Sequence, residues 1–260
     1  MALKKIQFFF LAVLLVLSCK YQNGELHKSR EKKGGRIKEE KKEKEPKEEW
    51  KLEWSEGFER IDPSLWTIRD DYKGGGSTGF NPLNAETDEG HLLLTLSGEP
   101  YYEKAVSGAE VFSTREVAFG KVEIKMRVPK GPGISCSVLT TSLAGAENKP
   151  HDEVSIQFKC SETRSVFFNY FKRKENMLNG NSYFLPFDAS DGYHIYSIER
   201  SHRYIKWFID GKLYYQTYEG IPGTAHRILF SIWSSSDEVA MKNLPAVLFI
   251  DYVKYFTRNR

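Results

Sequence analysis

From Trp50 onward, apolar and polar residues alternate with a period of two along many short segments. These segments are rich in Val, Ile, Phe and Tyr, and Gly, Pro, Asn and Asp separate them, as is typical of β-strands joined by turns. The pattern predicts strands in HLLLTLSG, GKVEIKMRV, DEVSIQFK, SVFFNYF, YHIYSIER, YIKWFIDGKLYYQ, RILFSIW and AVLFIDYVKYF, with a hairpin turn at Asp210-Gly211. We find no long helical period and no repeat, and we therefore expect an all-β sandwich of about 210 residues.

The segment 152–159 is the most informative of these strands because its two faces differ in chemistry. Its apolar residues alternate toward a core, while Glu153, Ser155 and Gln157 project in a row from the opposite face. Such a row indicates either a solvent-facing side of the sheet, which is the commoner case, or the floor of a cleft. Periodicity alone does not distinguish the two.

The first part of the chain differs in composition from the rest. Residues 1–19 contain a short basic start and an apolar run at 6–17, which is too short to span a bilayer comfortably and is typical of a signal peptide. The sequence VLSC at 16–19 resembles a bacterial lipobox, which implies lipidation of Cys19; an ordinary cleaved signal with an incidental cysteine is the alternative. Residues 20–49 are highly charged and nearly free of aliphatic residues, which predicts a disordered tether rather than a polybasic binding segment.

Composition narrows the possible function classes. The chain has 260 residues and a net charge of +3, but residues 50–260 hold 25 basic and 27 acidic side chains, which argues against nucleic-acid binding. A hydrophobic content of 40% is enough to build a core, which excludes a wholly disordered chain. Three cysteines are too few for a disulfide-dense scaffold.

Motifs in a fixed order along residues 50–258 resemble glycoside hydrolase family 16, the jelly-roll β-glucanases, and most of all the bacterial lichenases. SGAEVFS, AFGKVEIKMRVPKGPGIS and NKPHDEVSIQF resemble the family's GAE, YG-x-x-E-x-x-MK and DEIDIEF segments. FFNYF, PFDASDGYHIYSIE, YIKWFIDGKLYYQ, IP, SIW and IDYVKY follow in the family's order. The resemblance implies a concanavalin A-like β-sandwich jelly roll with a concave cleft face over residues 50–260.

The family's chemistry lies in an E-x-D-x-E signature, from which this chain departs. The first Glu is the nucleophile, the Asp tunes the pair, and the last Glu is the general acid/base of a retaining mechanism, which needs the two carboxyl groups about 5–5.5 Å apart. By resemblance Glu153 stands at the nucleophile position, while Ser155 replaces the Asp and Gln157 replaces the acid/base Glu. An amide cannot supply the proton, and acid–base catalysis is worth about 10²–10⁴-fold in rate. We therefore expect impaired hydrolysis, with rescue by Glu110 as the less favoured outcome; Asp152 should face the core side.

Five other positions match residues of the family's cleft, and four of them have a structural alternative. Trp233 matches a Trp that stacks on sugar, or it is a core residue. Phe171 replaces a Tyr and keeps only the ring, or it belongs to the core. Asn169 matches a cleft Asn, or it satisfies backbone groups. Glu110 matches a residue that touches sugar, or it is an exposed strand residue, and His151 occurs at its position in some members.

The cysteines and a metal site complete the expectations. If the strands that carry Cys136 and Cys160 pair antiparallel, the register puts Cys136 nearer to residue 157 than to Cys160, so free buried cysteines are favoured over a disulfide. No residue cluster has zinc spacing. The family often holds a structural calcium ion, to which Asp251 would contribute, but we expect no cofactor.

Three functions remain open. We favour a non-catalytic relative of lichenase, a monomer that binds a β-linked polysaccharide, a surface glycan, or an envelope or host partner and is lipid-anchored on the periplasmic or cell-surface face of a bacterial membrane. Phe112 in place of Arg and Ser231 in place of Asn favour it, because polar positions of the cleft are lost together. The alternatives are an active endo-β-1,3(4)-glucanase with a substituted acid/base, and an interaction module with a vestigial cleft.

Overall fold

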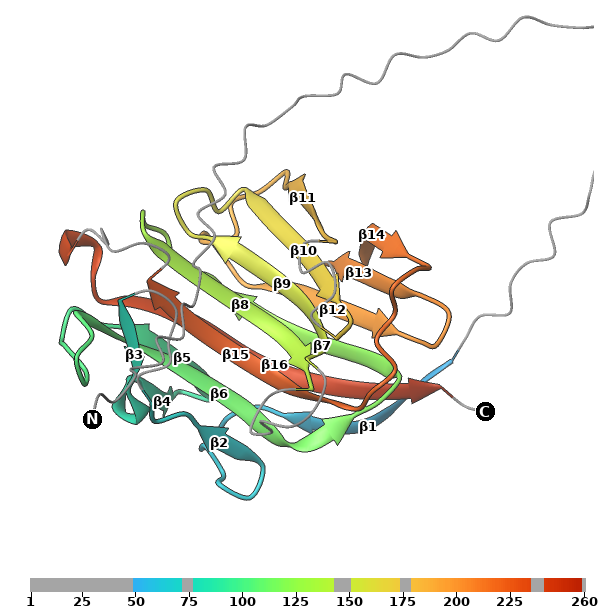
Figure 1. The fold of residues 1–260 in the computed structure, drawn as a ribbon, viewed down its shortest axis with the longest axis horizontal. Coiled ribbons are helices and arrows are strands. Elements are labelled where there is room, and N and C mark those ends of the chain that lie inside the picture. Colours follow the sequence, from blue (N-terminus) through green and yellow to red (C-terminus); the bar gives the residue numbers. More distant parts are fainter. Residues whose placement is uncertain (1–48, 72–76, 143–150, 174–178, 235–240, 259–260) are drawn as a thin grey trace, which may run out of the picture. The chain divides into compact units, whose positions relative to one another are not determined.

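The computed structural model describes five segments of the chain: residues 49–71, 77–142, 151–173, 179–234 and 241–258. All of them belong to one unit, Lys47–Arg260. Strands in two layers make up most of this unit (Figure 1), together with two short 3₁₀ helices, η1 (Pro82–Asn84) and η2 (Met241–Asn243). Neither helix is long or apolar enough to cross a bilayer, and no other helix occurs in these segments. The predicted signal peptide, Cys19 and nearly all of the tether lie outside the described residues.

The first sheet has eight strands in the order β14-β13-β12-β7-β16-β5-β4, and β1 pairs with β16 beside this path. Its pairings are antiparallel throughout. The strands are β1 (Trp50–Glu56), β4 (Ala85–Asp88), β5 (His91–Leu96), β7 (Gly120–Arg127), β12 (His194–Arg200), β13 (Ile205–Ile209), β14 (Lys212–Thr217) and β16 (Ala246–Arg258).

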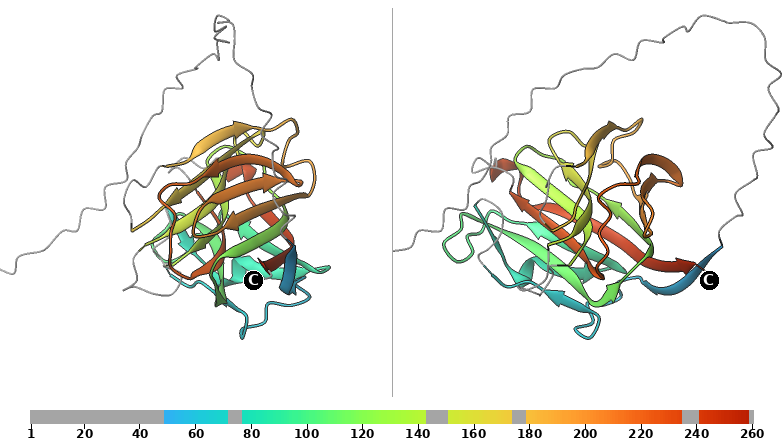
Figure 2. Two further views of the ribbon diagram at one scale, coloured as in Figure 1. Left: turned by 90° about the vertical axis from the view of Figure 1, so that its right-hand side faces the viewer. Right: turned by 45° about the vertical axis from the view of Figure 1, so that its right-hand side comes forward.

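The second sheet also has eight strands, in the order β11-β10-β9-β8-β15-β6-β2, and β3 pairs in parallel with β6. Figure 2 shows this sheet and the first one from two further sides. The strands are β2 (Trp66–Ile68), β3 (Thr78–Phe80), β6 (Val106–Val117), β8 (Ile134–Thr141), β9 (Glu153–Lys159), β10 (Ser165–Phe171), β11 (Asn181–Phe184) and β15 (His226–Ser234).

The predicted strands and turns are confirmed. Each of the eight predicted segments contains a strand, and YIKWFIDGKLYYQ contains the hairpin β13–β14. At its turn, Asp210 and Gly211 have φ angles of 49° and 76°, the left-handed pair that a two-residue hairpin loop requires. Glu89 and Gly90 repeat this geometry between β4 and β5, with φ angles of 47° and 76°.

The core lies between the two sheets and fixes the position of β9. Phe158 on β9 contacts Tyr196 on β12 edge to face, with ring centroids 5.7 Å apart, and both rings are buried. Trp207 on β13 stacks on Phe168 of β10 at 6.0 Å. The indole nitrogen of Trp207 donates to the backbone oxygen of Ser155 at 3.2 Å, and this hydrogen bond links the first sheet to the middle of β9.

The two described cysteines lie in this core as free thiols, as predicted. Cys136 lies opposite Phe158, nearer to residue 157 than to Cys160 as predicted, and Cys136 and Cys160 are diagonal neighbours on the core face. Their Sγ atoms are 3.8 Å apart. The hydrogen bond between them and burial raise the pKa of the Cys136 thiol well above its ordinary value.

Candidate functional site

The row Glu153, Ser155 and Gln157 on β9 is recessed in the protein and does not face bulk solvent. Ser155 is fully buried, and the side chain of Glu153 is only 13% exposed. Of the two interpretations of the alternating pattern, the cleft floor therefore fits and the open solvent face, the commoner case, does not. We call the side of the second sheet that carries this row the signature face.

Gln157 connects the row through its side-chain amide. Its Nε2 donates to Ser155 Oγ at 3.1 Å and to Glu153 Oε1 at 3.4 Å. Residues four apart on a strand are separated by roughly 13 Å along the backbone, so the two long side chains must lean toward one another. The strand therefore brings the two functional groups together as a retaining pair of carboxyl groups would require, but one of them is an amide.

Strand pairing extends this arrangement into a polar row across the sheet. Gln157 lies opposite Ser137 on β8, Ser137 lies opposite Ser231 on β15, and Ser231 lies opposite Glu110 on β6. Three strand spacings put the Cα atoms of Gln157 and Glu110 about 14 Å apart. The polar row thus carries one carboxyl group, at the end remote from Gln157.

A second row on the same face carries no charge, and its first three members are apolar. Phe112, Leu229 and Leu139 lie opposite one another on β6, β15 and β8, and they form a buried cluster separate from the main core. The row continues to Ser155 and then to Asn169, which is also buried. Phe112, which replaces an Arg of the family by resemblance, is therefore one member of a continuous uncharged row.

Glu110 is a buried, ion-paired carboxyl group. It is 7% exposed, so the alternative of an exposed strand residue is wrong. Its Oε1 lies 2.9 Å from Nε of Arg69, which also lies 3.8 Å from Oδ2 of Asp71. Burial raises the pKa of Glu110 to about 7, the charges of Asp71 and Glu153 act in the same direction, and Arg69 and the Ser231 hydroxyl oppose it. Burial outweighs the ion pair, so Glu110 holds its proton far more readily than an exposed glutamate.

His151 and Phe171 flank Glu153. Nε2 of His151 is 3.7 Å from Oε2 of Glu153, and the His151 ring meets the Phe171 ring edge to face at 4.7 Å. Phe171 lies opposite Glu153 in the β10–β9 pairing and is 3% exposed. Both interpretations of Phe171 are thus partly met, because the ring is buried but lies on the signature face and not in the main core.

Trp233 lies on the signature face near the end of β15. It is opposite Ser135 of β8 and two residues beyond Ser231, and it keeps partial exposure. Its neighbours in the chain, Ile232 and Ser234, are buried on the opposite side of the strand. A half-buried ring at this position fits a stacking platform better than a core residue.

Asp152 is turned away from the row, as predicted. It is 1% exposed; its Oδ1 accepts from the backbone nitrogen of Arg173 at 2.8 Å and its Oδ2 accepts from the Thr224 hydroxyl at 2.6 Å. These bonds use both carboxylate oxygens within the protein. Asp152 therefore fixes the start of β9 and is not placed to serve a ligand on the signature face.

Comparison with known proteins identifies the family. Residues 77–254 match the model of glycosyl hydrolases family 16. The chain belongs to this family. It is 32% identical over 203 residues to a β-glucanase of Paenibacillus macerans, and the match covers 74% of this chain and 83% of that protein. A β-glucanase of Acetivibrio thermocellus is 30% identical over 207 residues, and the match spans only 61% of that relative.

Solved structures show the same architecture. A β-1,3-1,4-glucanase (lichenase) from a mouse hindgut metagenome superimposes with a TM-score of 0.72 at 30% identity, covering 78% of this chain and 97% of that one. The β-glucanase of Bacillus licheniformis gives 0.71 at 28% identity. These structures confirm the predicted concanavalin A-like β-sandwich jelly roll.

Arg69 is the member of this family 16 site that sequence reasoning missed. Besides pairing with Glu110, its guanidinium lies 5.8 Å from the ring of Phe80 and 6.0 Å from the ring of Phe112. No alternation or motif around residue 69 distinguishes it from any other surface arginine. Ser137, in contrast, stands between the apolar residues Cys136 and Val138, so the alternation of polar and apolar residue types along β8 could have found it.

The described residues of this family 16 chain show no metal site. Asp251, the position considered for calcium, has its Oδ2 2.6 Å from Nζ of Lys125. Within the described segments no group of three or more His, Cys, Asp or Glu side chains is arranged to hold a metal ion. A lysine ammonium thus occupies the place beside Asp251 where a cation would bind.

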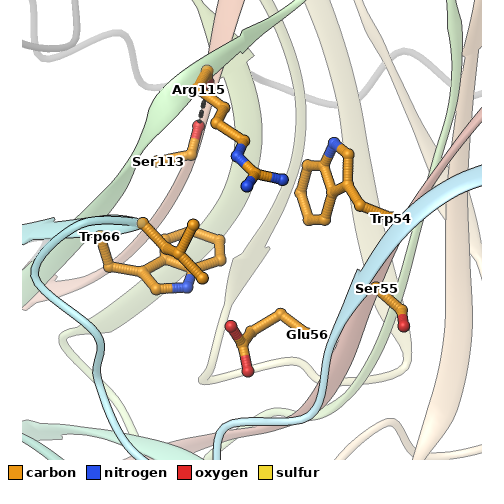
Figure 3. Close-up of a pocket in the computed structure, with 7 residues that line it drawn as sticks. Trp54, Ser55, Glu56, Trp66, Ser113 and Arg115 are labelled. Atoms are coloured by element: carbon orange, nitrogen blue, oxygen red, sulfur yellow. Dashed lines mark hydrogen bonds between the residues drawn. The ribbon is translucent and has the colours of Figure 1, made fainter.

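A small cavity elsewhere in the family 16 domain holds no residue of the signature row (Figure 3). The indole rings of Trp54 and Trp66 face it, with Arg115 and Glu56 at its sides. Its volume is about 30 Å³, which is room for about one or two water molecules. It is too small for a sugar.

Proposed function

We propose that this chain is a catalytically impaired member of family 16 that binds a β-linked glucan on its signature face. The observation that carries the proposal is the amide of Gln157, whose nitrogen lies within 3.4 Å of both Glu153 and Ser155 at the acid/base position. An amide can hydrogen-bond a sugar oxygen but cannot protonate a leaving group.

The nearby carboxyl groups do not replace the missing acid. Asp152 is engaged by Arg173 and Thr224. Glu110 has a suitable pKa of about 7 but sits about 14 Å from Gln157 at Cα and is paired with Arg69. Retaining hydrolysis requires the two carboxyl groups to be about 5–5.5 Å apart, on either side of one glycosidic bond.

The remaining groups favour a glycan as the ligand. Trp233 offers a partly exposed indole, and the apolar face of a sugar ring packs well on indole. Gln157, Glu153 and His151 offer donors and acceptors in a recessed surface, the combination that saccharide binding needs. The relatives named β-glucanases support a β-glucan as the ligand class.

The same proposal includes export and anchoring. The apolar run at 6–17 and the sequence VLSC at 16–19 support a signal peptide and a lipid on Cys19. Residues 20–49 would then tether a monomeric domain to the periplasmic or cell-surface face of a bacterial membrane. Metabolic labelling with a fatty acid tests this, because a Cys19→Ser variant should carry no label.

Turnover is the first experiment. The purified protein is incubated with mixed-linkage β-glucan and with laminarin, and new reducing ends are measured beside a Glu153→Gln control. We expect no turnover above the control. Turnover that Glu153→Gln abolishes would establish the alternative, a glucanase with a substituted acid; Glu110→Gln would then be the next variant.

Binding is measured separately by calorimetry with oligosaccharides of the same glucans. Replacing Trp233 by Ala removes the stacking ring and should weaken binding by about 1.5 kcal/mol, roughly tenfold. Tyr218→Ala is the matched control, because Tyr218 is an exposed ring, 63% accessible, outside the signature face. An affinity that is the same for the Trp233 variant and wild type would refute glycan binding at this face.

A further inference from the structure

The solvent-facing side of the first sheet carries a regular array of cations and aromatic rings. Along β7, β12, β13 and β16, the residues that alternate with core residues point away from the second sheet, and we call this side the outer face. Each of the six cations that these described strands present there lies over a partly exposed ring, 4.0–5.5 Å from its centroid. The pairs are Lys121–Phe256, Lys125–Tyr193, Arg127–Phe249, Lys206–Tyr204, Lys254–Tyr252 and Arg258–Trp50.

The outer face is positively charged, although the domain as a whole is not. Its six cations stand against three carboxylates in the same described strands, those of Glu123, Glu199 and Asp251, which gives a net charge of +3. Residues 50–260 hold 25 basic and 27 acidic side chains, so 19 basic and 24 acidic ones remain elsewhere, a net charge of −5. Such a separation of charge turns this face toward an anionic surface.

Strand β1 adds an exposed apolar edge to the outer face. Trp50 lies opposite Arg258, and Leu52 lies opposite Phe256. The side chain of Leu52 is 49% exposed, and the rings of Trp50 and Phe256 are partly exposed. Aromatic rings beside lysine and arginine are the combination that proteins place at the boundary between a membrane and water.

The chain enters the domain at this same edge, because Trp50 follows Glu49, the first described residue. A lipid on Cys19 would precede the domain by residues 20–49, and a flexible chain of that length spans about 30 Å on average. The outer face would therefore stay within reach of the bilayer that holds the lipid. The tether also carries eleven basic and eight acidic side chains, so its net charge has the same sign as that of the outer face.

We propose that the outer face docks on an anionic lipid bilayer, a proposal that rests on the proposed anchoring. Trp50 and Leu52 lie at the level of the headgroups, and the cations of the face meet the lipid phosphates. Lys206 and Lys254 form no ion pair within the described segments, so their charges are available to the lipid. Each cation beside an anionic bilayer strengthens binding by about fivefold. In this orientation the signature face, on the other sheet, points away from the bilayer and stays open to a glycan.

Vesicle sedimentation tests this with the chain from residue 19 onward carrying Cys19→Ser, which keeps the whole unit Lys47–Arg260 but has neither the apolar leader nor a lipid. The probes are vesicles of phosphatidylglycerol and phosphatidylcholine in equal amounts, vesicles of phosphatidylcholine alone, and polygalacturonate as a soluble polyanion. We expect binding to the anionic vesicles only, and release at high salt. Lys254→Glu should weaken this binding by about tenfold or more, because it reverses a charge on the outer face. Lys159→Glu is the matched control, because Lys159 is exposed on β9 in the second sheet, and it should bind as wild type does.

A nitroxide label reports which side of the domain meets the bilayer. It is attached to Leu52→Cys or to Lys159→Cys in the same chain, whose native Cys136 and Cys160 are buried. On anionic vesicles the label on Leu52→Cys should lose access to a water-soluble relaxation agent, whereas the label on Lys159→Cys should keep it. The melting temperature of each variant is recorded, and this measurement decides the question if Lys254→Glu is unfolded.

Four results would overturn the proposal. They are the absence of binding to the anionic vesicles, an equal change of affinity in Lys254→Glu and Lys159→Glu, a label on Leu52→Cys that stays accessible on vesicles, and binding to polygalacturonate alone. The second would show a response to net charge or to the tether, and the last would make the outer face a site for an acidic polysaccharide. None of these measurements involves a lipid on Cys19, which fatty-acid labelling tests separately. Failure of docking and failure of anchoring are therefore distinguishable.

Discussion

Replacing Gln157 by Glu is the sharpest test of how the signature face is built. The wild-type amide nitrogen already lies 3.4 Å from Glu153 Oε1, so the substitution puts a second carboxyl group at the acid/base position with no change of side-chain length. It should convert a protein without turnover into a weak β-glucanase. The proton that an amide cannot carry is then available where the leaving oxygen would lie.

The size of the effect follows from the distance. Two like charges at 3.4 Å repel by about 5 kcal/mol at an effective dielectric constant of about 20, and about 3 kcal/mol remains if the side chains relax to about 5.5 Å. That repulsion raises the pKa of one of the two carboxyl groups well above its ordinary value, so this group keeps its proton in weakly acidic solution. That arrangement supplies a general acid, worth about 10²–10⁴-fold in rate over the wild-type protein.

The assay is reducing-end release from mixed-linkage β-glucan across a pH series, with Glu153→Gln added to the same chain as the control. Activity should rise and then fall with pH, and the control should abolish it. Gln157→Glu protein that is folded and still binds glucan but shows no gain in turnover would refute this reasoning. If wild type and Gln157→Glu both lack turnover and both fail to bind glucan, the chain is instead an interaction module with a vestigial cleft.

Three further predictions concern buried groups. Because burial holds the pKa of Glu110 near 7, folding stability should fall by about 3 kcal/mol as pH rises from 4.5 to about 7, and denaturant titrations of Glu110→Gln should lack this slope. Burial and the charge of Arg200 lower the pKa of His226 and keep its ring neutral. The stability that the neutral ring adds to the folded state is complete above pH 6.5 and is lost as pH falls below that value. The free energy of unfolding of His226→Gln should therefore depend less on pH in acid solution than that of wild type. In a Cys19→Ser chain, Cys136 and Cys160 should react with a thiol reagent only after denaturation, and rapid reaction of the native protein would contradict their burial.

Most of the fold could be predicted because its strands carry a strict period of two. In β7 and β9 every second residue is buried in the core, so the pattern gives both the strand and its inner face. The period-two pattern did not mark β1, β2, β3, β4, β6, β8 or β11, none of which lies in the eight predicted segments. The sequence WKLEWSE mixes charges with its apolar residues, and it becomes a strand because β16 offers it an edge to pair with.

The candidate site could be predicted along one strand but not across strands. Glu153, Ser155 and Gln157 share one sequence segment, and their common face follows from alternation. The ion pair of Arg69 with Glu110 joins positions 41 residues apart, and only the register of β2 and β6 brings these regions together.

On the signature face, the loss of the family's Asp at Ser155 and the loss of its Arg at Phe112, both inferred by resemblance, belong together. Ser155 is fully buried, and its cross-strand neighbour Leu139 belongs to the apolar cluster with Phe112 and Leu229. An aspartate at position 155 would place a carboxylate beside that cluster, where burial disfavours the charged form. Ser155→Asp alone should therefore destabilise this protein by about 1–3 kcal/mol, as a buried polar group without full compensation does. A denaturation midpoint unchanged from wild type would show instead that the apolar row and the lost aspartate are independent.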